Sequence, residues 1–217
     1  MGLASRIVRG DGMRKSRLHN YEGERIDLGG LCYLPQAIAS TILRKLLGYR
    51  PEVPWLGYRA IRRLHRLIRN DWRLLEFGSG MSSLWFARRC RLLVSIESDE
   101  SWYARLSRYF TERGLSNIDY RLSTPEEYAC VEDYADHSFD FVLIDGIRRN
   151  EAARTAIAKA RRGGFVYLDN TDVPWDEYRA ARETLLRAAG SPHKLHYFND
   201  FCPTQCSVHQ GLLIQTS

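Results

Sequence analysis

The chain has 217 residues, 44% of them hydrophobic, which is enough for one buried α/β core with an appendage but too little for two full catalytic domains. No apolar run approaches the length of a membrane span, and the charged N-terminus, with Arg6, Arg9 and Asp11, lacks the apolar core of a signal peptide. We therefore expect a cytoplasmic protein.

The net charge of +6 is unevenly distributed along the chain. Residues 1–73 hold 15 Lys and Arg against 6 Asp and Glu, whereas the remainder holds 17 against 20. The basic segment can be a solvated helix face, or it can contact an acidic membrane surface, a phosphorylated substrate carrier or RNA. A peripheral contact with an acidic surface through this segment is therefore an open expectation.

The cysteines suit a reducing compartment because their number is odd and they are scattered. They are Cys32, Cys90, Cys130, Cys202 and Cys206. The spacing from Cys202 through Cys206 to His209 resembles a metal site, but a fourth zinc ligand at normal spacing is missing. We expect two buried thiols near the last strand instead.

The N-terminal part is predicted to be helical after an irregular start over residues 1–33. From Leu34 to Leu47, apolar residues recur every four positions and Gly48 supplies a stop, so we predict a helix. A second helix is predicted over Trp55–Arg69, with arginines covering much of its surface. Residues 1–71 are expected to form a basic helical extension, or lid, beside the rest of the chain.

The segment that follows Trp72 has the most informative pattern. An apolar run from Leu74 to Phe77 is typical of a short buried strand. Gly78-Ser79-Gly80 then predicts a turn whose missing side chains let the backbone approach a ligand closely. Ser82 and Ser83 are suited to cap the helix that follows.

The next predicted strand, residues 92–96, ends at Glu97, whose carboxylate can accept hydrogen bonds from both ribose hydroxyls of a nucleoside. These features together predict a nucleoside-binding βαβ unit. A dinucleotide fingerprint would have a third glycine where Ser83 stands, so a pyrophosphate cradle is not expected. The form Glu76-x-Gly78-x-Gly80 instead resembles motif I of class I S-adenosylmethionine-dependent methyltransferases, and the resemblance extends over residues 72–217.

Beyond Glu97, predicted strands and helices alternate, which indicates an α/β fold with a doubly wound, mostly parallel sheet. Helices are predicted over residues 101–113, 151–161 and 175–189, with a short helix start at 124–127. Strands are predicted over residues 118–122, 139–144, 165–168, 195–198 and 211–214. The resemblance implies a seven-stranded Rossmann-like sheet whose last two strands pair antiparallel, with residues 72–217 as the catalytic domain.

Three predicted strands end on polar side chains, namely Glu97, Asp145 and the pair Asp169-Asn170. The carboxyl ends of strands in an open α/β sheet line one crevice, where ligands bind. We therefore expect these side chains to converge on the functional site.

The resemblance also implies a set of cofactor contacts. Glu97 would bind the ribose, Ser123 would border the adenine, and the glycine turn would meet the amino-acid end of S-adenosylmethionine. The full set of expected cofactor-binding residues is Glu76, Gly78, Ser79, Gly80, Ser82, Ser83, Glu97, Ser123 and Asp145.

Asp145, Asp169 and Asn170 offer hard oxygen ligands of the kind that Mg²⁺ prefers. Their spacing resembles the catechol O-methyltransferases and the metal-dependent macrolide-sugar O-methyltransferases, in which the metal favours the ionised substrate hydroxyl. The same residues are also common in helix caps and turns. The expectation of a metal therefore competes with a purely local role.

The residue that removes the acceptor's proton is left open by the sequence. Catechol enzymes have a lysine three residues after the first metal aspartate, and here that position is Arg148, which stays charged and cannot act as a base. Asp145 or Asp172 could take the proton, and Asp145 is the candidate catalytic residue.

The combined expectation is O-methylation of a hydroxyl on a sugar, polysaccharide or secondary-metabolite acceptor. Motifs of amino-methylating and cytosine-methylating enzymes are absent after Asp145, so nucleic acid is not the expected partner. Two alternatives stay open: an RNA-directed methyltransferase, and a non-catalytic adaptor that binds the cofactor and docks a partner through its arginine-rich helices.

Overall fold

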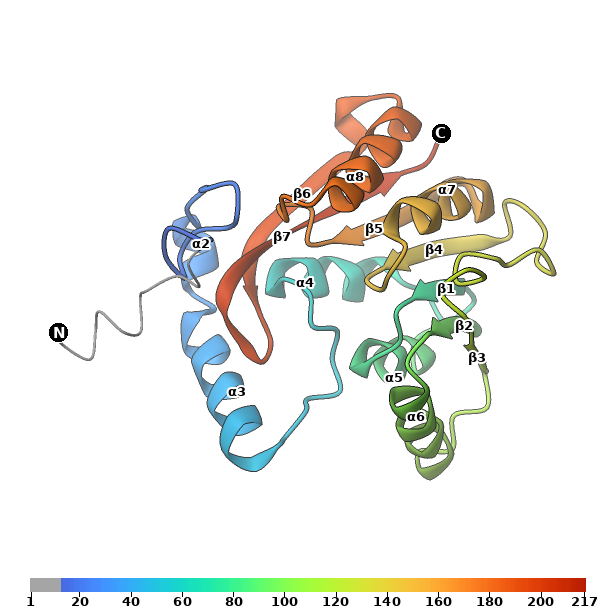
Figure 1. The fold of residues 1–217 in the computed structure, drawn as a ribbon, viewed down its shortest axis with the longest axis horizontal. Coiled ribbons are helices and arrows are strands. Elements are labelled where there is room, and N and C mark those ends of the chain that lie inside the picture. The colour runs from blue at the N-terminus through green and yellow to red at the C-terminus, as the bar shows by residue number, and fades with distance from the viewer. Residues whose placement is uncertain (1–12) are drawn as a thin grey trace, which may run out of the picture.

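A seven-stranded sheet in the order β3-β2-β1-β4-β5-β7-β6 forms the centre of the computed structural model, which describes residues 13–217 (Figure 1). Its strands are β1 (Arg73–Phe77), β2 (Leu92–Glu97), β3 (Ile118–Leu122), β4 (Phe139–Ile144), β5 (Ala160–Asp169), β6 (Leu195–Cys202) and β7 (Gln205–Gln215). The first five strands run parallel, and β7 lies antiparallel between β5 and β6. The predicted doubly wound sheet with an antiparallel closing pair is confirmed.

Helices cover both faces of this sheet. They are α2 (Leu28–Leu31), α3 (Leu34–Leu47), α4 (Tyr58–Leu67), α5 (Met81–Ala87), α6 (Glu100–Glu112), α7 (Arg149–Lys159) and α8 (Asp176–Ala189), with a 3-10 turn, η1, at Pro192–Lys194. Alternate strand residues point to opposite faces. Leu75 and Phe77 therefore pack with α7 and α8, whereas Leu74 packs with α4 and α5.

Helix α4 is shorter than the predicted Trp55–Arg69 and packs directly on the sheet. Ala60 and Leu64 are fully buried in the same apolar cluster as Leu74 of β1. The residues before Tyr58 form a linker with bends and no helix, because Pro51 and Pro54 interrupt helical hydrogen bonding there. The division of the chain at residue 71 stays a prediction, although α4 shares its core with the strands beyond that point.

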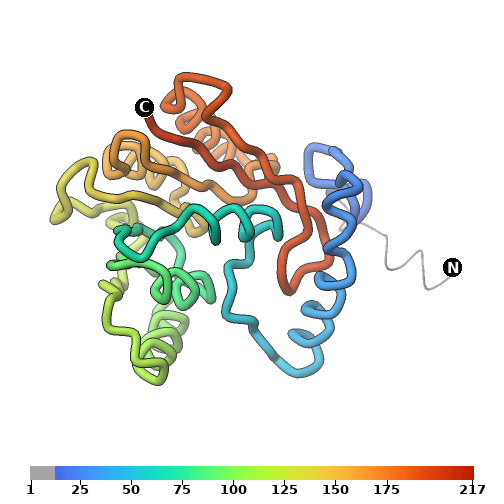
Figure 2. Tube along the Cα trace, turned by 180° about the vertical axis from the view of Figure 1, so that it is seen from behind, coloured from blue at the N-terminus to red at the C-terminus, as the bar shows by residue number. Residues whose placement is uncertain are grey.

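The closing hairpin is longer than the two four-residue strands predicted from the sequence. The extra length comes from residues that pair with each other beyond the edge of the central sheet, from Asn199↔Gln210 to the turn; most are polar, but Phe201↔Val208 is a buried apolar pair. Figure 2 shows this hairpin reaching α3, where Phe201 and Val208 pack against Ala37. Buried Asp200 accepts hydrogen bonds from the backbone N–H of Arg59 (2.9 Å) and from its Nε (3.2 Å), which ties the hairpin to α4.

Helix α3 has the predicted bounds, and Gly48 ends it with a left-handed backbone (φ 64°). Residues 13–33, expected to be irregular, contain the short helix α2. The predicted helix start at residues 124–127 is a set of turns instead. Residues 1–12 of the predicted irregular segment lie outside the described part of the chain.

None of the helices between residues 13 and 217 combines the length and apolar character needed to cross a bilayer. The five cysteines are unpaired; Cys202 is buried and Cys206 is partly buried, so one of the two thiols near the last strands is as enclosed as expected. Within residues 13–217, no group of three His, Cys, Asp or Glu side chains is arranged to hold a metal ion. The spacing of Cys202, Cys206 and His209 therefore does not produce a metal site there.

Candidate active site

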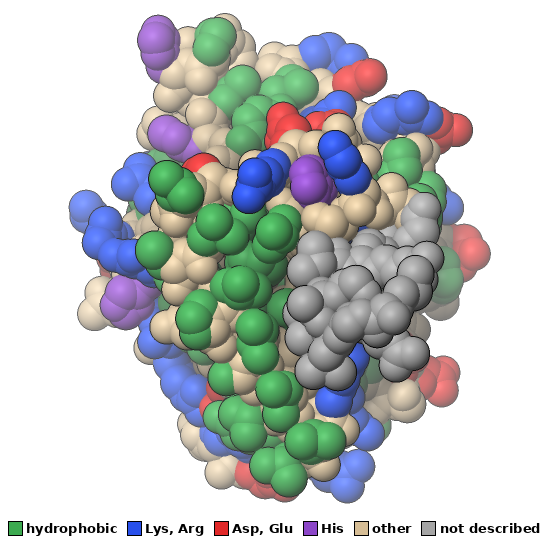
Figure 3. All heavy atoms as spheres, turned by 90° about the vertical axis from the view of Figure 1, so that its left-hand side faces the viewer, with side chains coloured by type: hydrophobic (Ala, Val, Ile, Leu, Met, Phe, Trp, Pro, Cys, Tyr) green, Lys and Arg blue, Asp and Glu red, His purple; other side chains and the backbone are tan. Residues whose placement is uncertain are grey.

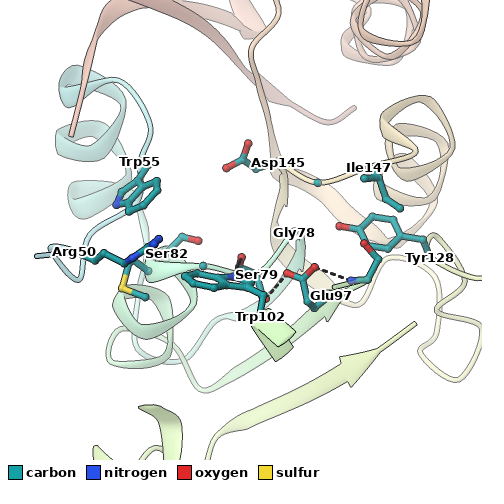
Figure 4. Close-up of a pocket in the computed structure, with 14 residues that line it drawn as sticks. Arg50, Trp55, Gly78, Ser79, Ser82, Glu97, Trp102, Tyr128, Asp145 and Ile147 are labelled. Atoms are coloured by element: carbon teal, nitrogen blue, oxygen red, sulfur yellow. Dashed lines mark hydrogen bonds between the residues drawn. The ribbon is translucent and has the colours of Figure 1, made fainter. Parts of the chain in front are cut away.

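A cavity of about 380 Å³ opens at the carboxyl ends of β1, β2 and β4 (Figure 4). It is lined by Arg50, Trp55, Gly78, Ser79, Gly80, Met81, Ser82, Glu97, Ser98, Trp102, Tyr128, Asp145, Gly146 and Ile147. The structure thus brings together the glycine turn and two of the three polar strand ends that the sequence singled out. Asp169 and Asn170, at the third strand end, do not line it.

The glycine turn holds the tips of β1 and β4 in contact. Gly78 has a φ of +96°, and a Cβ on it would lie 2.6 Å from the backbone nitrogen of Gly146. A Cβ on Gly146 would collide with the hydroxyl of Tyr128, at 1.8 Å. A side chain at Gly78 would therefore push the ends of β1 and β4 apart, and a side chain at Gly146 would displace Tyr128.

Glu76 lies beneath this turn and does not line the cavity. Its carboxylate is fully buried and accepts hydrogen bonds from the hydroxyls of Ser82, Ser83 and Ser95, at 2.5–2.6 Å. Burial raises the pKa of Glu76 to about 7, although the three hydroxyl donors lower it. Glu76 and Ser83, both expected to bind the cofactor, are placed to shape the turn from below.

Glu97 closes one side of the cavity with a carboxylate that is already oriented. Its Oε1 accepts from the backbone N–H groups of Ser98 (2.7 Å) and Asp99 (2.9 Å), and its Oε2 accepts from the hydroxyl of Ser79 (2.7 Å). A carboxylate offers about four acceptor positions. Glu97 therefore keeps acceptor capacity toward the cavity, as its expected role on a ribose requires.

Ser123 lines a different cavity, together with Ile96, Leu122 and Glu127. Its backbone N–H donates to the carbonyl of Glu97 (2.8 Å), so the two residues are linked through the backbone. In the main cavity, Tyr128 and Ile147 lie at the end opposite Arg50 and Trp55 (Figure 4). The expected contact of Ser123 with the adenine stays a prediction.

Arg149 occupies the space between the ends of β4 and β5. Its Nη2 donates to Oδ1 of Asp145 (3.2 Å) and to Oδ1 of Asn170 (3.3 Å), and its Nη1 donates to the backbone carbonyl of Asp169. The guanidinium also stacks on Tyr178, with 4.4 Å between Cζ and the ring centre. Only 4% of Arg149 is exposed, so a fixed positive charge is built into this part of the structure.

Because Arg149 occupies this space, the oxygens of Asp145, Asp169 and Asn170 that were expected to hold Mg²⁺ do not fit a metal ion. The oxygens of Asp145 and Asn170 already bind the guanidinium, and a second cation beside it would be repelled. Burial raises the pKa of Asp169 well above its ordinary value, and the negative charge of Asp145 adds to the effect. The expectation of a metal stays untested, but the contacts of Arg149 oppose it.

Eight lining residues were not predicted as site residues, namely Arg50, Trp55, Met81, Ser98, Trp102, Tyr128, Gly146 and Ile147. The indole Nε1 of Trp102 donates to the carbonyl of Ser79 (2.9 Å), which fastens the first turn of α6 to the glycine turn. The start of α6 directly after Glu97 could have indicated Trp102. Arg50 and Trp55 lie in the linker before α4, and no local pattern indicated that this linker reaches the cavity.

No protein-family model and no curated protein match this chain, but solved structures share its fold. The O-methyltransferase from Bacillus cereus, in complex with SAH, is 14% identical, with a TM-score of 0.64 over 84% of this chain and 99% of its own. The O-methyltransferase TomG from Streptomyces achromogenes, involved in tomaymycin synthesis and in complex with SAM, is 20% identical, with a TM-score of 0.58 over 84% and 90%. An rRNA methylase from Streptococcus thermophilus is 11% identical, with a TM-score of 0.58 over 74% and 96%.

These similarities establish that the chain has the fold of class I S-adenosylmethionine-dependent methyltransferases. Identities of 11–20% are too low to transfer an acceptor. The named acceptors of these structures also differ in kind, since one structure is an rRNA methylase. The chemistry of this chain therefore has to be argued from its own side chains.

We predict that the chain does not bind a divalent metal between Asp145 and Asn170, because the guanidinium of Arg149 already bridges them. Titration with Mn²⁺, followed by electron paramagnetic resonance, should show only the free ion at millimolar concentration. Asp145→Asn serves as the control, since it removes the proposed ligand. Bound Mn²⁺ that disappears in this variant would contradict the prediction.

Proposed function

We propose that this chain transfers a methyl group from S-adenosylmethionine to a hydroxyl oxygen of a small-molecule acceptor. The observation that carries the proposal is one cavity lined by the glycine turn, by the preoriented carboxylate of Glu97 and by Asp145. When bound, S-adenosylmethionine supplies an electrophilic methyl group on a sulfonium. The acceptor class we propose is a sugar, a glycan or a secondary metabolite.

The residues present suit this cofactor. Glu97 would accept hydrogen bonds from the ribose hydroxyls, since its backbone and Ser79 contacts fix it at the strand end. The backbone of Gly78 and Gly80 would meet the amino-acid part, because no side chain shields it there. Tyr128 and Ile147 provide apolar surface for the base at the far side of the cavity.

Asp145 is the proposed general base for the acceptor hydroxyl. Its side chain is 30% exposed and lines the cavity. Burial raises its pKa above the ordinary value, while the charge of Arg149 lowers it. A raised pKa makes the carboxylate a better proton acceptor, and the ion pair with Arg149 holds Oδ1 so that Oδ2 can face the acceptor.

The bound cofactor would supply the methyl group, whose bond to sulfur would be exchanged for a bond to the acceptor oxygen with a neutral thioether as the leaving group. Asp145 would take the proton that the acceptor hydroxyl loses. The chain contributes the alignment and the base. Arg149 stabilises the ionised form of Asp145 before the transfer.

A peripheral contact with an acidic membrane is a further part of the proposal. The outward side of α3 is apolar and exposed, with Leu46 at 76% and Leu47 at 74% (Figure 3). The last turn of α3 carries Arg44 and Lys45, and residues 28–51 contain no acidic residue. An apolar helix face with cations beside it favours an anionic lipid surface.

We predict that Glu97→Ala weakens binding of S-adenosylmethionine by about 1.5–3 kcal/mol, the range for a hydrogen bond to a charged group. Titration calorimetry measures the change, and thermal unfolding shows whether the variant is folded. Glu100→Ala is the matched control, because Glu100 is exposed on α6 and does not line the cavity. Tighter binding of NAD than of S-adenosylmethionine would refute the proposed cofactor.

Asp145→Asn should lower methyl transfer by about 10²–10⁴-fold, the usual contribution of a general base. In the wild type, kcat/KM should rise with pH as Asp145 loses its proton, and the raised pKa places this rise above the range of an ordinary aspartate. Transfer of labelled methyl groups to a panel of sugars and phenols provides the assay.

Asp176→Asn is the control for this rate measurement, since Asp176 is 96% exposed. A wild-type rate and pH profile in Asp145→Asn would exclude Asp145 as the base. Thermal unfolding must accompany the assay, because the asparagine removes the carboxylate that forms an ion pair with buried Arg149.

Vesicles of phosphatidylglycerol should co-sediment the protein, and vesicles of phosphatidylcholine should not. The double substitution Leu46→Asp, Leu47→Asp should abolish the binding, whereas Leu122→Asp, on a different exposed apolar residue, should leave it unchanged. Failure to bind, together with a concentration-dependent dimer that the double substitution dissociates, would assign this face to a second copy of the chain.

A further inference from the structure

Among the described residues that line the main cavity, Arg50 is the one cation. It lies in the linker between α3 and α4, far in sequence from the glycine turn. In Figure 4, Arg50 and Trp55 lie at one end of the cavity, near Ser82, whereas Tyr128 and Ile147 lie at the other. The linker therefore forms a wall of the site.

The guanidinium of Arg50 is held by aromatic rings. Its Cζ lies 5.2 Å from the ring centre of Trp102 and 5.8 Å from that of Trp55. Glu52, two residues further along, forms ion pairs with Arg88 (2.7 Å) and with Arg113. Within residues 13–217, no carboxylate forms an ion pair with Arg50.

A second donor in the same wall has no acceptor among the described residues. The indole Nε1 of Trp55 is buried and has no hydrogen-bond acceptor among the described residues. A buried N–H without an acceptor is costly, so its presence requires an explanation. An anionic group bound at Arg50 would therefore be held by the guanidinium beside the ring of Trp55, since the Nε1 of Trp55 is itself buried.

We propose that Arg50 and Trp55 form a subsite for a carboxylate of the ligand that occupies this cavity. This inference rests on the proposed function. A guanidinium presents several N–H groups in a plane that matches the two oxygens of a carboxylate. The stacking indoles would hold that plane toward the cavity, and partial burial would strengthen its attraction for an anion.

Two ligands can supply the carboxylate, namely the amino-acid end of the cofactor and an acidic acceptor. The position of Arg50 near Ser82 places it at the end of the cavity where the glycine turn would meet the amino-acid part. With Glu97 and Asp145 as the other charged lining residues, the cavity carries a cation at one end and carboxylates along its side. This distribution suits a ligand that is itself a zwitterion.

The test compares two nucleosides that differ in the amino-acid part. S-adenosylhomocysteine carries the carboxylate, and 5′-methylthioadenosine lacks it. Arg50→Gln should weaken binding of the first by about 10- to 100-fold and leave the second within about twofold. Arg105→Gln is the matched control, because Arg105 also stacks on Trp102 (5.6 Å) but is exposed and does not line the cavity.

A second arm assigns the source of the carboxylate. Binding of 4-hydroxybenzoate and of the neutral 4-hydroxybenzamide is measured with S-adenosylhomocysteine already bound. The subsite serves the acceptor if Arg50→Gln leaves the affinity for S-adenosylhomocysteine unchanged, weakens binding of 4-hydroxybenzoate and does not weaken binding of 4-hydroxybenzamide. Equal losses for both nucleosides, or no loss for any probe, would overturn the subsite. A wild-type protein that binds neither nucleoside would instead overturn the proposed function.

Discussion

The buried carboxylate of Glu76 organises the cavity. It receives hydroxyl hydrogens from Ser82 and Ser83 at the start of α5 and from Ser95 of β2, so one side chain joins β1 to its two neighbouring elements. Removing a carboxylate from water is expensive unless its oxygens are fully hydrogen-bonded. Because these contacts depend on the path of the turn, the turn and the carboxylate stabilise each other. The hydrogen bond from Ser95 also fixes β2, the strand that ends at Glu97.

A second constraint is the positive charge of Arg149 between the ends of β4 and β5. A divalent ion at this place could exchange with solvent, whereas a guanidinium belongs to the chain and is always present. Its hydrogen bonds to Asp145 and Asn170 keep these side chains oriented without any added ligand. The site is thus organised before substrate arrives, as electrostatic catalysis requires.

Much of the fold followed from local patterns in the sequence. The strand at residues 139–144 is an apolar run between turns, and the structure gives it the predicted bounds. Glu97 and Asp145 were found because strand ends meet at one edge of a parallel sheet. Arg50 and Trp55 were not found, since their approach depends on how a proline-containing linker crosses the molecule. The hairpin was underestimated because most residues of its distal half are polar, and the single pair of Phe201 with Val208 makes no apolar alternation.

The contact between Gly78 and Gly146 has a consequence for the ancestry of this chain. The two glycines are 68 positions apart, yet a side chain on Gly78 would collide with the backbone of Gly146, and one on Gly146 would collide with the hydroxyl of Tyr128. Selection would therefore act on them as a single inherited character, together with Tyr128, whose hydroxyl fills the space above Gly146. Distant descendants of the same ancestor could be recognised by this trio even after most of the surrounding sequence has diverged.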